Sequence, residues 1–546
     1  MKKWWIVILL AFMLSISLAS AQKTYHLKLL AVQENGDGTS AGSGADLFLE
    51  LKEGTGRVFL DTFPVTKMDT QISTRFAKEI ACHEFKLPCH RYDFIYTIKA
   101  DSNIIGGPSA GAAIAALTTI AALDLDYDQG IAITGTINSG GIVGPVGGVK
   151  QKLEAASRLS LKKVLVAKGT ASIPEEEVNS TSQINSSDFN ESINFNLTKY
   201  AAENLSLDMV EVSSLDEVLF DLTGKQLNHK EVTIAENEDY TQIMNNLRDR
   251  LCQRVEKIRS EFRKEGLYIN ESIIQRVGEQ QNKSENATRQ GDHYSAASYC
   301  FTANILLRSE YYGAKKPSLS IVWDRFILLE KDVQNLEKDL KKEPIETITD
   351  LQVFLVVKER LDDVREQISE FKANQGEKAD HYYASLSYAE ERFYSAQAWM
   401  EFFSMGGKKL VLDKAHMQQS CLQKTSEAEE RYNYLRLYIG EGNIMDIGKK
   451  IDGAKSASGK GEYELCLSKS IEAKGDSNAV LSSMGLRRDI LPEILDSKNA
   501  AVKRVIAENS AEGKFPILGY SYYKYANSLQ EQEPFTALVY YEYALE

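Results

Sequence analysis

The sequence lacks an excess of basic residues. It contains 64 Lys and Arg residues against 77 Asp and Glu residues, which gives a net charge of −13. Proteins that bind nucleic acid in a general way, or that dock on anionic lipid, depend on positively charged surfaces. The composition therefore disfavours both kinds of partner, and we expect no nucleic-acid binding.

Long apolar runs and nucleotide-binding loops are also scarce. After the first twenty residues, no segment is long and apolar enough to cross a bilayer. The sequence has no Gly-x-x-x-x-Gly-Lys-Ser/Thr loop, since Gly453–Gly461 ends in Gly-Lys-Gly and carries no hydroxyl there. An ATPase of the P-loop type is therefore not expected, and we predict no cofactor.

The N-terminus has the features of a targeting segment. Lys2 and Lys3 precede an apolar stretch over residues 4–18, and residues 19–21 are small, as at a cleavage site. Residues 1–21 are therefore predicted to be a signal peptide or an uncleaved N-terminal membrane anchor. Both alternatives place the rest of the chain outside the cytoplasm, either secreted or anchored to a membrane.

Six cysteines fit this extracytoplasmic location, because an even number of cysteines in an exported protein permits disulfides. Cys82 and Cys89 are close enough in sequence to close a small loop, and we predict a disulfide between them. The alternative is a metal site that includes His83 and His90. That spacing fits no common zinc pattern, so no metal site is predicted.

The length of 546 residues exceeds what one hydrophobic core supports, so two or three domains are expected. Strand and helix patterns alternate over residues 22–224, which predicts one α+β domain. Its stretch over residues 175–204 is polar and contains the sequons that start at Asn179, Asn185, Asn190, Asn196 and Asn204, so it is predicted to be a surface insertion. Residues 225–546 carry only helical patterns, which predicts an all-α region.

Hydrophobic periodicity gives the expected elements. Strands are predicted at Tyr25–Val32, Ala45–Leu51, Arg57–Phe63, Tyr92–Ile98, Ile131–Ile137, Lys163–Ala167 and Met209–Val212. Helices are predicted at Met68–His83, Ser109–Leu123, Val149–Leu159 and Leu215–Leu222.

In the second half, apolar residues spaced by three and four over residues 326–340 and 354–371 predict two helices. The break at Lys341–Pro344 makes them an antiparallel hairpin. Tyrosine-rich segments at 293–307, 381–400 and 520–545 loosely resemble helix-pair repeats. The alternative, which we prefer, is ordinary packed helices whose tyrosines line the core.

The box Gly107-Pro108-Ser109-Ala110-Gly111 places a serine at the entry of a predicted helix. A helix N-terminus offers unpaired N–H groups and a positive dipole end, which would stabilise the oxyanion formed in acyl transfer. A serine in this place is also a common helix cap. The box by itself therefore does not identify a nucleophile.

A second set of residues completes the pattern. Thr134-Gly135 ends a predicted strand, and the run Pro145–Lys152 opens the next helix and is followed by two alanines. The whole span resembles the proteolytic domain of Lon proteases, which are Ser–Lys serine peptidases. The resemblance covers residues 92–168 clearly, extends over residues 24–224, and does not include the helical half. It implies a Lon-type α+β proteolytic domain followed by an all-α region of helical hairpins or repeat-like pairs.

The resemblance also assigns the site residues. It implies that Ser109 is the nucleophile, that Lys152 is the general base and that Thr134 supports the lysine by a hydrogen bond. Lys150 is a competing base, but residues two apart on a helix point in different directions, and the resemblance selects Lys152. A lysine base must be neutral, so burial has to lower its pKa; we expect the Ala-rich helix after Ser109 to form the apolar wall.

The sequence departs from the family in two places. Gly106 stands where many relatives carry an acid, which raises the question of how the serine loop is held, and the ATPase is missing. We therefore predict an exported, ATP-independent serine endopeptidase that acts on peptides or unfolded proteins. A homo-oligomer is implied only by the rings that Lon relatives form. The alternative is a non-catalytic exported scaffold that keeps the Lon-like fold.

Overall fold

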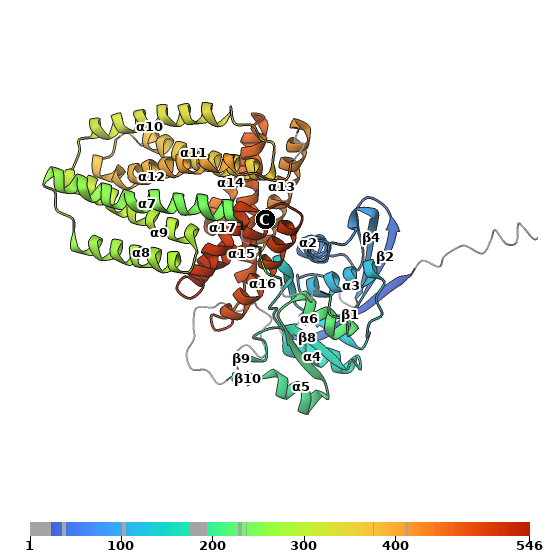
Figure 1. Cartoon of the computed structure of the whole chain (residues 1–546). Helices are drawn as coiled ribbons and strands as arrows, with labels where there is room; N and C mark the ends of the chain where they lie inside the picture. The colour runs from blue at the N-terminus through green and yellow to red at the C-terminus, as the bar shows by residue number, and fades with distance from the viewer. Residues whose placement is uncertain are drawn as a thin grey trace, which may run out of the picture. The chain divides into compact units, whose positions relative to one another are not determined.

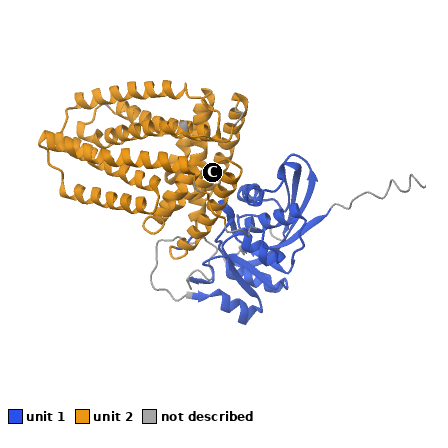
Figure 2. Ribbon diagram, in the orientation of Figure 1, with its two compact units in different colours: residues 1–229, 485–487 blue, residues 230–484, 488–546 orange. Residues whose placement is uncertain are grey.

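The computed structural model describes residues 23–34, 40–100, 105–174, 194–227, 232–235, 237–374, 376–409 and 413–546. The chain divides into two compact units, one of residues Met1–His229 with Gly485–Arg487 and one of residues Lys230–Met484 with Arg488–Glu546 (Figure 2). The predicted signal peptide or anchor lies outside the described residues, as do residues 175–193 of the predicted insertion.

The first unit is built on a four-stranded sheet in the order β1-β2-β4-β3 (Figure 1). Its strands are β1 (Thr24–Glu34), β2 (Ser40–Glu53), β3 (Val58–Phe63) and β4 (Tyr92–Ala100). β2 pairs antiparallel with β1 and β4, whereas β3 pairs parallel with β4 at the edge of the sheet. The parallel pair is possible because α2 (Met68–Glu84) provides the crossover between these two strands.

A second, parallel sheet has the order β11-β8-β5. The strands are β5 (Ile131–Thr134), β8 (Lys163–Ala167) and β11 (Asp208–Val212), and two short pairs join β6 (Thr136–Asn138) to β7 (Ile142–Gly144) and β9 (Ser172–Pro174) to β10 (Asn194–Asn196). The helices of this part are α3 (Gly111–Leu123), α4 (Val149–Arg158), α5 (Leu197–Leu205) and α6 (Leu215–Thr223). The α/β character predicted for the first half is therefore confirmed.

One predicted strand was wrong in its extent. Residues 131–137 were expected to be continuous, but β5 ends at Thr134 and β6 begins at Thr136. The break falls on Gly135, whose N–H donates to the carbonyl of Ser109 at 3.0 Å and whose carbonyl accepts from the N–H of Ala112 at 3.1 Å. The backbone of Gly135 is thus committed to the start of α3 instead of a neighbouring strand.

All of the regular secondary structure described for the second unit is helical (Figure 1). They are α7 (Glu238–Glu265), α8 (Glu271–Arg289), α9 (His293–Lys315), α10 (Leu319–Leu340), α11 (Ile348–Ala373), α12 (Tyr383–Trp399), α13 (Lys414–Leu435), α14 (Met445–Gly459), α15 (Tyr463–Ser483), α16 (Leu491–Ala511), α17 (Ile517–Leu529) and α18 (Pro534–Leu545). The all-α prediction is confirmed. The break expected at residues 341–344 falls between α10 and α11, and α11 begins with a capping box formed by Thr347 and Asp350.

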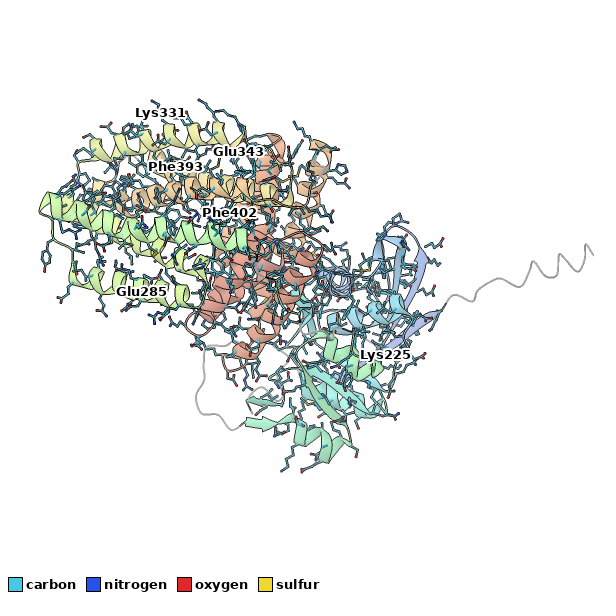
Figure 3. The ribbon with its side chains drawn as sticks, viewed as in Figure 1. Lys225, Glu285, Lys331, Glu343, Phe393 and Phe402 are labelled. Atoms are coloured by element: carbon cyan, nitrogen blue, oxygen red, sulfur yellow. A yellow bond between two sulfur atoms is a disulfide. The ribbon has the colours of Figure 1, made fainter. Side chains whose placement is uncertain are left out.

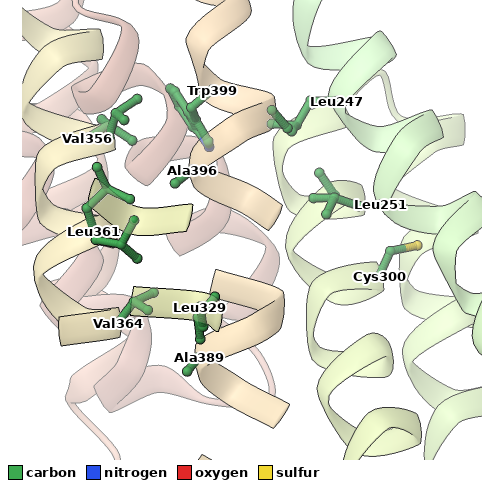
Figure 4. Packing of buried hydrophobic residues seen from close by; sticks show 14 of the residues in the cluster. Leu247, Leu251, Cys300, Leu329, Val356, Leu361, Val364, Ala389, Ala396 and Trp399 are labelled. Atoms are coloured by element: carbon green, nitrogen blue, oxygen red, sulfur yellow. The ribbon is translucent and has the colours of Figure 1, made fainter. Parts of the chain in front are cut away.

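The core of this unit is apolar and aromatic. Leu247 and Leu251 of α7 point inward together with Val356 of α11 and Trp399 of α12 (Figure 4). Exposed charged side chains such as Glu285 on α8 and Lys331 on α10 lie on the outside (Figure 3). Many of the tyrosines are buried, as the packed-core alternative predicted: Tyr240, Tyr294, Tyr299, Tyr311, Tyr312, Tyr382, Tyr383, Tyr434 and Tyr541.

All six cysteines are paired. Cys82 is bonded to Cys89, which confirms the predicted disulfide. Two further disulfides lie in the helical unit, one between α7 and α9 (Cys252–Cys300) and one between α13 and α15 (Cys421–Cys466). No helix within the described ranges combines the length and the apolar character needed to cross a membrane.

Candidate active site

Ser109 lies in a turn immediately before α3. The helix begins at Gly111, its N-cap residue is Ala110, and no side chain caps it. The predicted helix start at Ser109 is therefore two residues too early, and the serine does not act as the cap. Ser109 is partly exposed, and its carbonyl accepts the hydrogen bond from Gly135 that holds the turn against the end of β5.

The turn is also held from its other side by the start of α2. The N–H of Gly107 donates to Oδ2 of Asp69 at 3.0 Å, and the N–H of Lys67 donates to the carbonyl of Ile105 at 2.8 Å. Gly107 has φ = 95°, a conformation that favours glycine. Asp69 was not identified from the sequence, because nothing local connects it to a turn 38 residues away.

Gly106 packs against the side chain of Lys67. A Cβ atom at position 106 would lie 2.8 Å from Cδ of Lys67, so a side chain there would have to displace that lysine. The carboxylate that meets the serine turn comes instead from Asp69 on α2. Asp69 therefore gives the serine turn a carboxylate partner, although position 106 carries no acid.

Lys152 lies inside the first unit on α4. Only 4 % of the residue is exposed, and burial lowers the pKa of its ammonium group from the usual 10.5 to about 7. Strand β2 approaches α4 closely next to this residue, since a Cβ atom at Gly42 would lie 1.8 Å from the carbonyl oxygen of Gln151. A neutral lysine is therefore accessible near neutral pH at this position.

The apolar face of α4 packs on the strands of the first unit. Its cluster is formed with Leu30 of β1, Ala132 of β5 and Val164 of β8, and it includes no described residue of α3. Helix α3 packs against α2, α6 and the strands β1, β2 and β5. Lys152 is not a member of the α4 cluster, so the apolar wall that we expect from the helix after Ser109 stays a prediction.

Lys150, the competing base, has different surroundings. Its Nζ atom lies 5.9 Å from the ring centroid of Phe195 and 5.7 Å from that of Tyr200. These distances are typical of cation–π contacts. Of the two lysines on α4, Lys150 is half-buried and Lys152 is buried.

Thr134 ends β5 next to Gly135. The residue is 1 % exposed, and its hydroxyl oxygen has no hydrogen-bond partner within the described part of the chain. The implied hydrogen bond to Lys152 is therefore not formed in this structure, nor does a hydrogen bond join the side chains of Ser109 and Lys152 among the described residues. Catalytic hydrogen bonds are often long when no substrate is bound. A buried hydroxyl without a partner costs folding free energy, which suggests a functional use for Thr134.

The α3 N-terminus offers fewer free donors than the sequence suggested. The N–H of Gly111 donates to the carbonyl of Pro108 at 3.0 Å, and the N–H of Ala112 donates to Gly135. The N–H groups of Ser109 and Ala110 make no backbone hydrogen bond to a described residue. These two groups are the donors available to a ligand at the serine.

Comparison with known proteins locates this site within a family domain. Residues 99–200 match the Lon protease (S16) C-terminal proteolytic domain, and this range includes Ser109, Thr134 and Lys152. The chain is 42 % identical to the Lon protease of Rhizobium meliloti over 78 residues, which are 14 % of this chain and 10 % of that protein.

Two further relatives match the same family. The chain is 44 % identical to the archaeal Lon protease of Archaeoglobus fulgidus over 64 residues, 12 % of this chain and 10 % of that protein. It is 37 % identical to the Lon protease of Rickettsia conorii over 125 residues, 22 % of this chain and 13 % of that protein. The chain thus spans only 10–13 % of the length of these three relatives. The first unit of this chain therefore contains a region that matches the Lon protease proteolytic domain.

Proposed function

We propose that the protein is an exported, ATP-independent serine endopeptidase in which Ser109 is the nucleophile and Lys152 the general base. The observation that carries the proposal is the burial of Lys152, which brings the pKa of its ammonium group to about 7 inside the Lon-type domain. A lysine with an ordinary pKa would be charged at neutral pH and could not accept a proton.

In the proposed mechanism, Oγ of Ser109 attacks the scissile carbonyl while neutral Lys152 accepts the hydroxyl proton. The N–H groups of Ser109 and Ala110 donate to the oxyanion of the tetrahedral intermediate. The lysine then returns the proton to the leaving amine, which departs and leaves an ester on Ser109. Water hydrolyses this ester by the same proton route. The hydroxyl of Thr134 orients the amine of Lys152.

Export and independence from ATP rest on separate features. The three disulfides favour an oxidising compartment, in agreement with the N-terminal segment of the sequence. The sequence has no P-loop, so energy-driven unfolding of substrates is not part of the proposal. Suitable substrates are then peptides or already unfolded proteins. Attachment to a membrane through the N-terminus and assembly into a homo-oligomer remain proposals.

The test is digestion of an unstructured protein such as casein, without ATP, by the parent protein and by three variants. Ser109→Ala and Lys152→Ala are expected to lose at least a thousandfold in kcat/KM. The matched control is Lys150→Ala, which changes the neighbouring lysine of α4 and is expected to retain activity. Folded, inactive protein in all four samples would instead favour the non-catalytic scaffold.

A covalent probe for serine nucleophiles gives a second readout. The proposal predicts labelling of Ser109 in the parent and in Lys150→Ala. Labelling that is confined to a different serine would contradict the assignment of the nucleophile.

A further inference from the structure

The helical unit contains a cavity of about 350 Å³ between α11, α15, α16, α17 and α18. Most of its lining is aliphatic: Ile348, Leu351, Leu355, Leu467, Ile471 and Val505. Helices α15, α16 and α17 each contact α18, and α11 contacts α15 and α17. A cavity of this size and lining is suited to a small organic molecule.

Four charged side chains interrupt the aliphatic lining, and two of them have close partners: Glu546 pairs with Lys474 at 3.0 Å and Lys514 pairs with Glu512 at 2.7 Å. Glu359 of α11 and Glu472 of α15 both line the cavity. Glu472 keeps 26 % of its side-chain surface accessible, yet burial raises its pKa to about 7, and the charge of Glu359 contributes in the same direction. Both observations are explained if the accessible surface of Glu472 faces the cavity, where the negative charge of Glu359 is close.

The cations around these carboxylates do not balance them equally. Glu359 accepts a hydrogen bond from Arg392 at 2.6 Å. The nearest cation to Glu472 is Lys450, whose Nζ atom is 3.5 Å away and lies closer, at 2.7 Å, to Asp476. The hydroxyl of Ser468 donates a long hydrogen bond to Glu472, at 3.4 Å. Glu472 is therefore the carboxylate that an additional cation would stabilise most.

A polar group without a partner lies on the same wall. The side-chain oxygen of Gln352 is buried and accepts no hydrogen bond from any described residue, and Gln352 also lines the cavity. Gln352 precedes Glu359 by two helical turns, about 10 Å along α11, so both side chains lie on one face of the helix. An unsatisfied acceptor of this kind is costly unless a ligand or water donates to it.

We propose that this cavity binds a small organic cation, namely an ammonium group carried on an apolar chain. The ammonium group lies next to Glu359 and Glu472 and donates to both carboxylates. The apolar chain runs along the aliphatic residues of α11 and α15. The site belongs to the helical unit and does not depend on the proposed peptidase activity.

The experiment compares three probes that have the same apolar chain: hexylamine, hexanol and hexanoate, added to the full chain in a calorimetric titration. Hexylamine is expected to bind at least ten times more tightly than hexanol, because only the amine makes charge-assisted hydrogen bonds, and hexanoate is expected not to bind. Equal affinity for the amine and the alcohol, or no binding of the amine, would overturn the proposal.

Variants locate the binding. Glu472→Gln is expected to weaken hexylamine about tenfold and to leave hexanol unchanged, whereas Glu531→Gln, which changes an exposed glutamate of the same unit, should have no effect. Ile471→Trp fills the cavity and should abolish binding of both probes. Far-UV circular dichroism checks that each variant is folded. Hexylamine binding that survives Ile471→Trp in a folded protein would show a different site and reject the proposal.

Discussion

Two lysines on one short helix show how position changes the chemistry of a side chain. Lys150 contacts two aromatic rings, while Lys152 is buried and loses the solvation of its charge. The spacing of two residues turns the side chains in different directions. Two lysines with different surroundings therefore lie about 3 Å apart along the helix axis.

The pKa of Lys152 sets the expected pH dependence of proteolysis. Below about pH 7 the lysine is protonated, so kcat/KM should fall about tenfold per pH unit, and above pH 7 it should reach a plateau. The measurement is kcat/KM for a fluorogenic peptide between pH 5 and pH 9, with Lys150→Ala as the control. A profile that is flat across pH 7 would show that Lys152 is not the base.

Asp69 offers a test of how the serine turn is held. Asp69→Ala removes the acceptor for the N–H of Gly107 and should lower kcat about tenfold with little change in KM, because the turn loses its position but substrate contacts remain. Asp69→Asn keeps an acceptor oxygen and should retain most of the activity. The control is Asp61→Asn, which alters an exposed aspartate of β3. Equal kcat in Asp69→Ala and the parent would show that the contact is dispensable.

At the scale of elements, local patterns predicted most helices and strands within a few residues. β8 was predicted without error at Lys163–Ala167, and the helix after the glycine turn begins at Val149 as predicted. The Tyr-rich stretch 520–545, for which no helix boundary is predicted, contains most of α17 and all of α18, and Pro534 starts α18. Proline is favoured in the first turn of a helix and ends a preceding one.

Long-range relations could not be predicted in this way. The order β1-β2-β4-β3 depends on pairing between strands that are far apart in sequence, and no local pattern encodes it. The same reason explains which residues of the site could be predicted from the sequence. Ser109, Thr134 and Lys152 are assigned by the resemblance of local motifs to the Lon family, whereas Asp69 reaches the serine turn only after α2 and β4 are packed. The break at Gly135 was missed because its partners, Ser109 and Ala112, belong to another element.

The disulfides differ in the length of chain that they enclose. Cys82–Cys89 spans 7 residues, whereas Cys252–Cys300 spans 48 and Cys421–Cys466 spans 45. On the chain-entropy account, removal of the short one costs about 2.5 kcal/mol and removal of either long one about 4 kcal/mol. Denaturant unfolding of the three paired Cys→Ala variants measures this difference. A larger loss for the short loop than for the long ones would contradict the account.

At the scale of the whole molecule, the two units have separate cores, so calorimetry should resolve two unfolding transitions. The long-loop disulfide variants should lower the midpoint temperature of the helical unit's transition only. Lys152→Met should raise the midpoint temperature of the first unit's transition only. The folded pKa of Lys152 lies below its unfolded value, so the cost of burial is fully present below about pH 7 and fades towards pH 10.5. Lys152→Met should therefore raise the free energy of unfolding by on the order of 3 kcal/mol at pH 6 and much less at pH 10. A single transition that all variants shift together would show that the units unfold as one.

The bonds of Gly135 give the site a reporter that is independent of catalysis. Its amide proton and that of Ala112 are both used to fasten the serine turn to the strand end. Hydrogen exchange at these two amides should be slow only while the turn is intact. An inactive variant that still protects both amides has lost a chemical group, whereas one that exchanges them quickly has lost the architecture around the nucleophile. The two kinds of failure look alike in any assay of turnover, but hydrogen exchange at these two amides separates them.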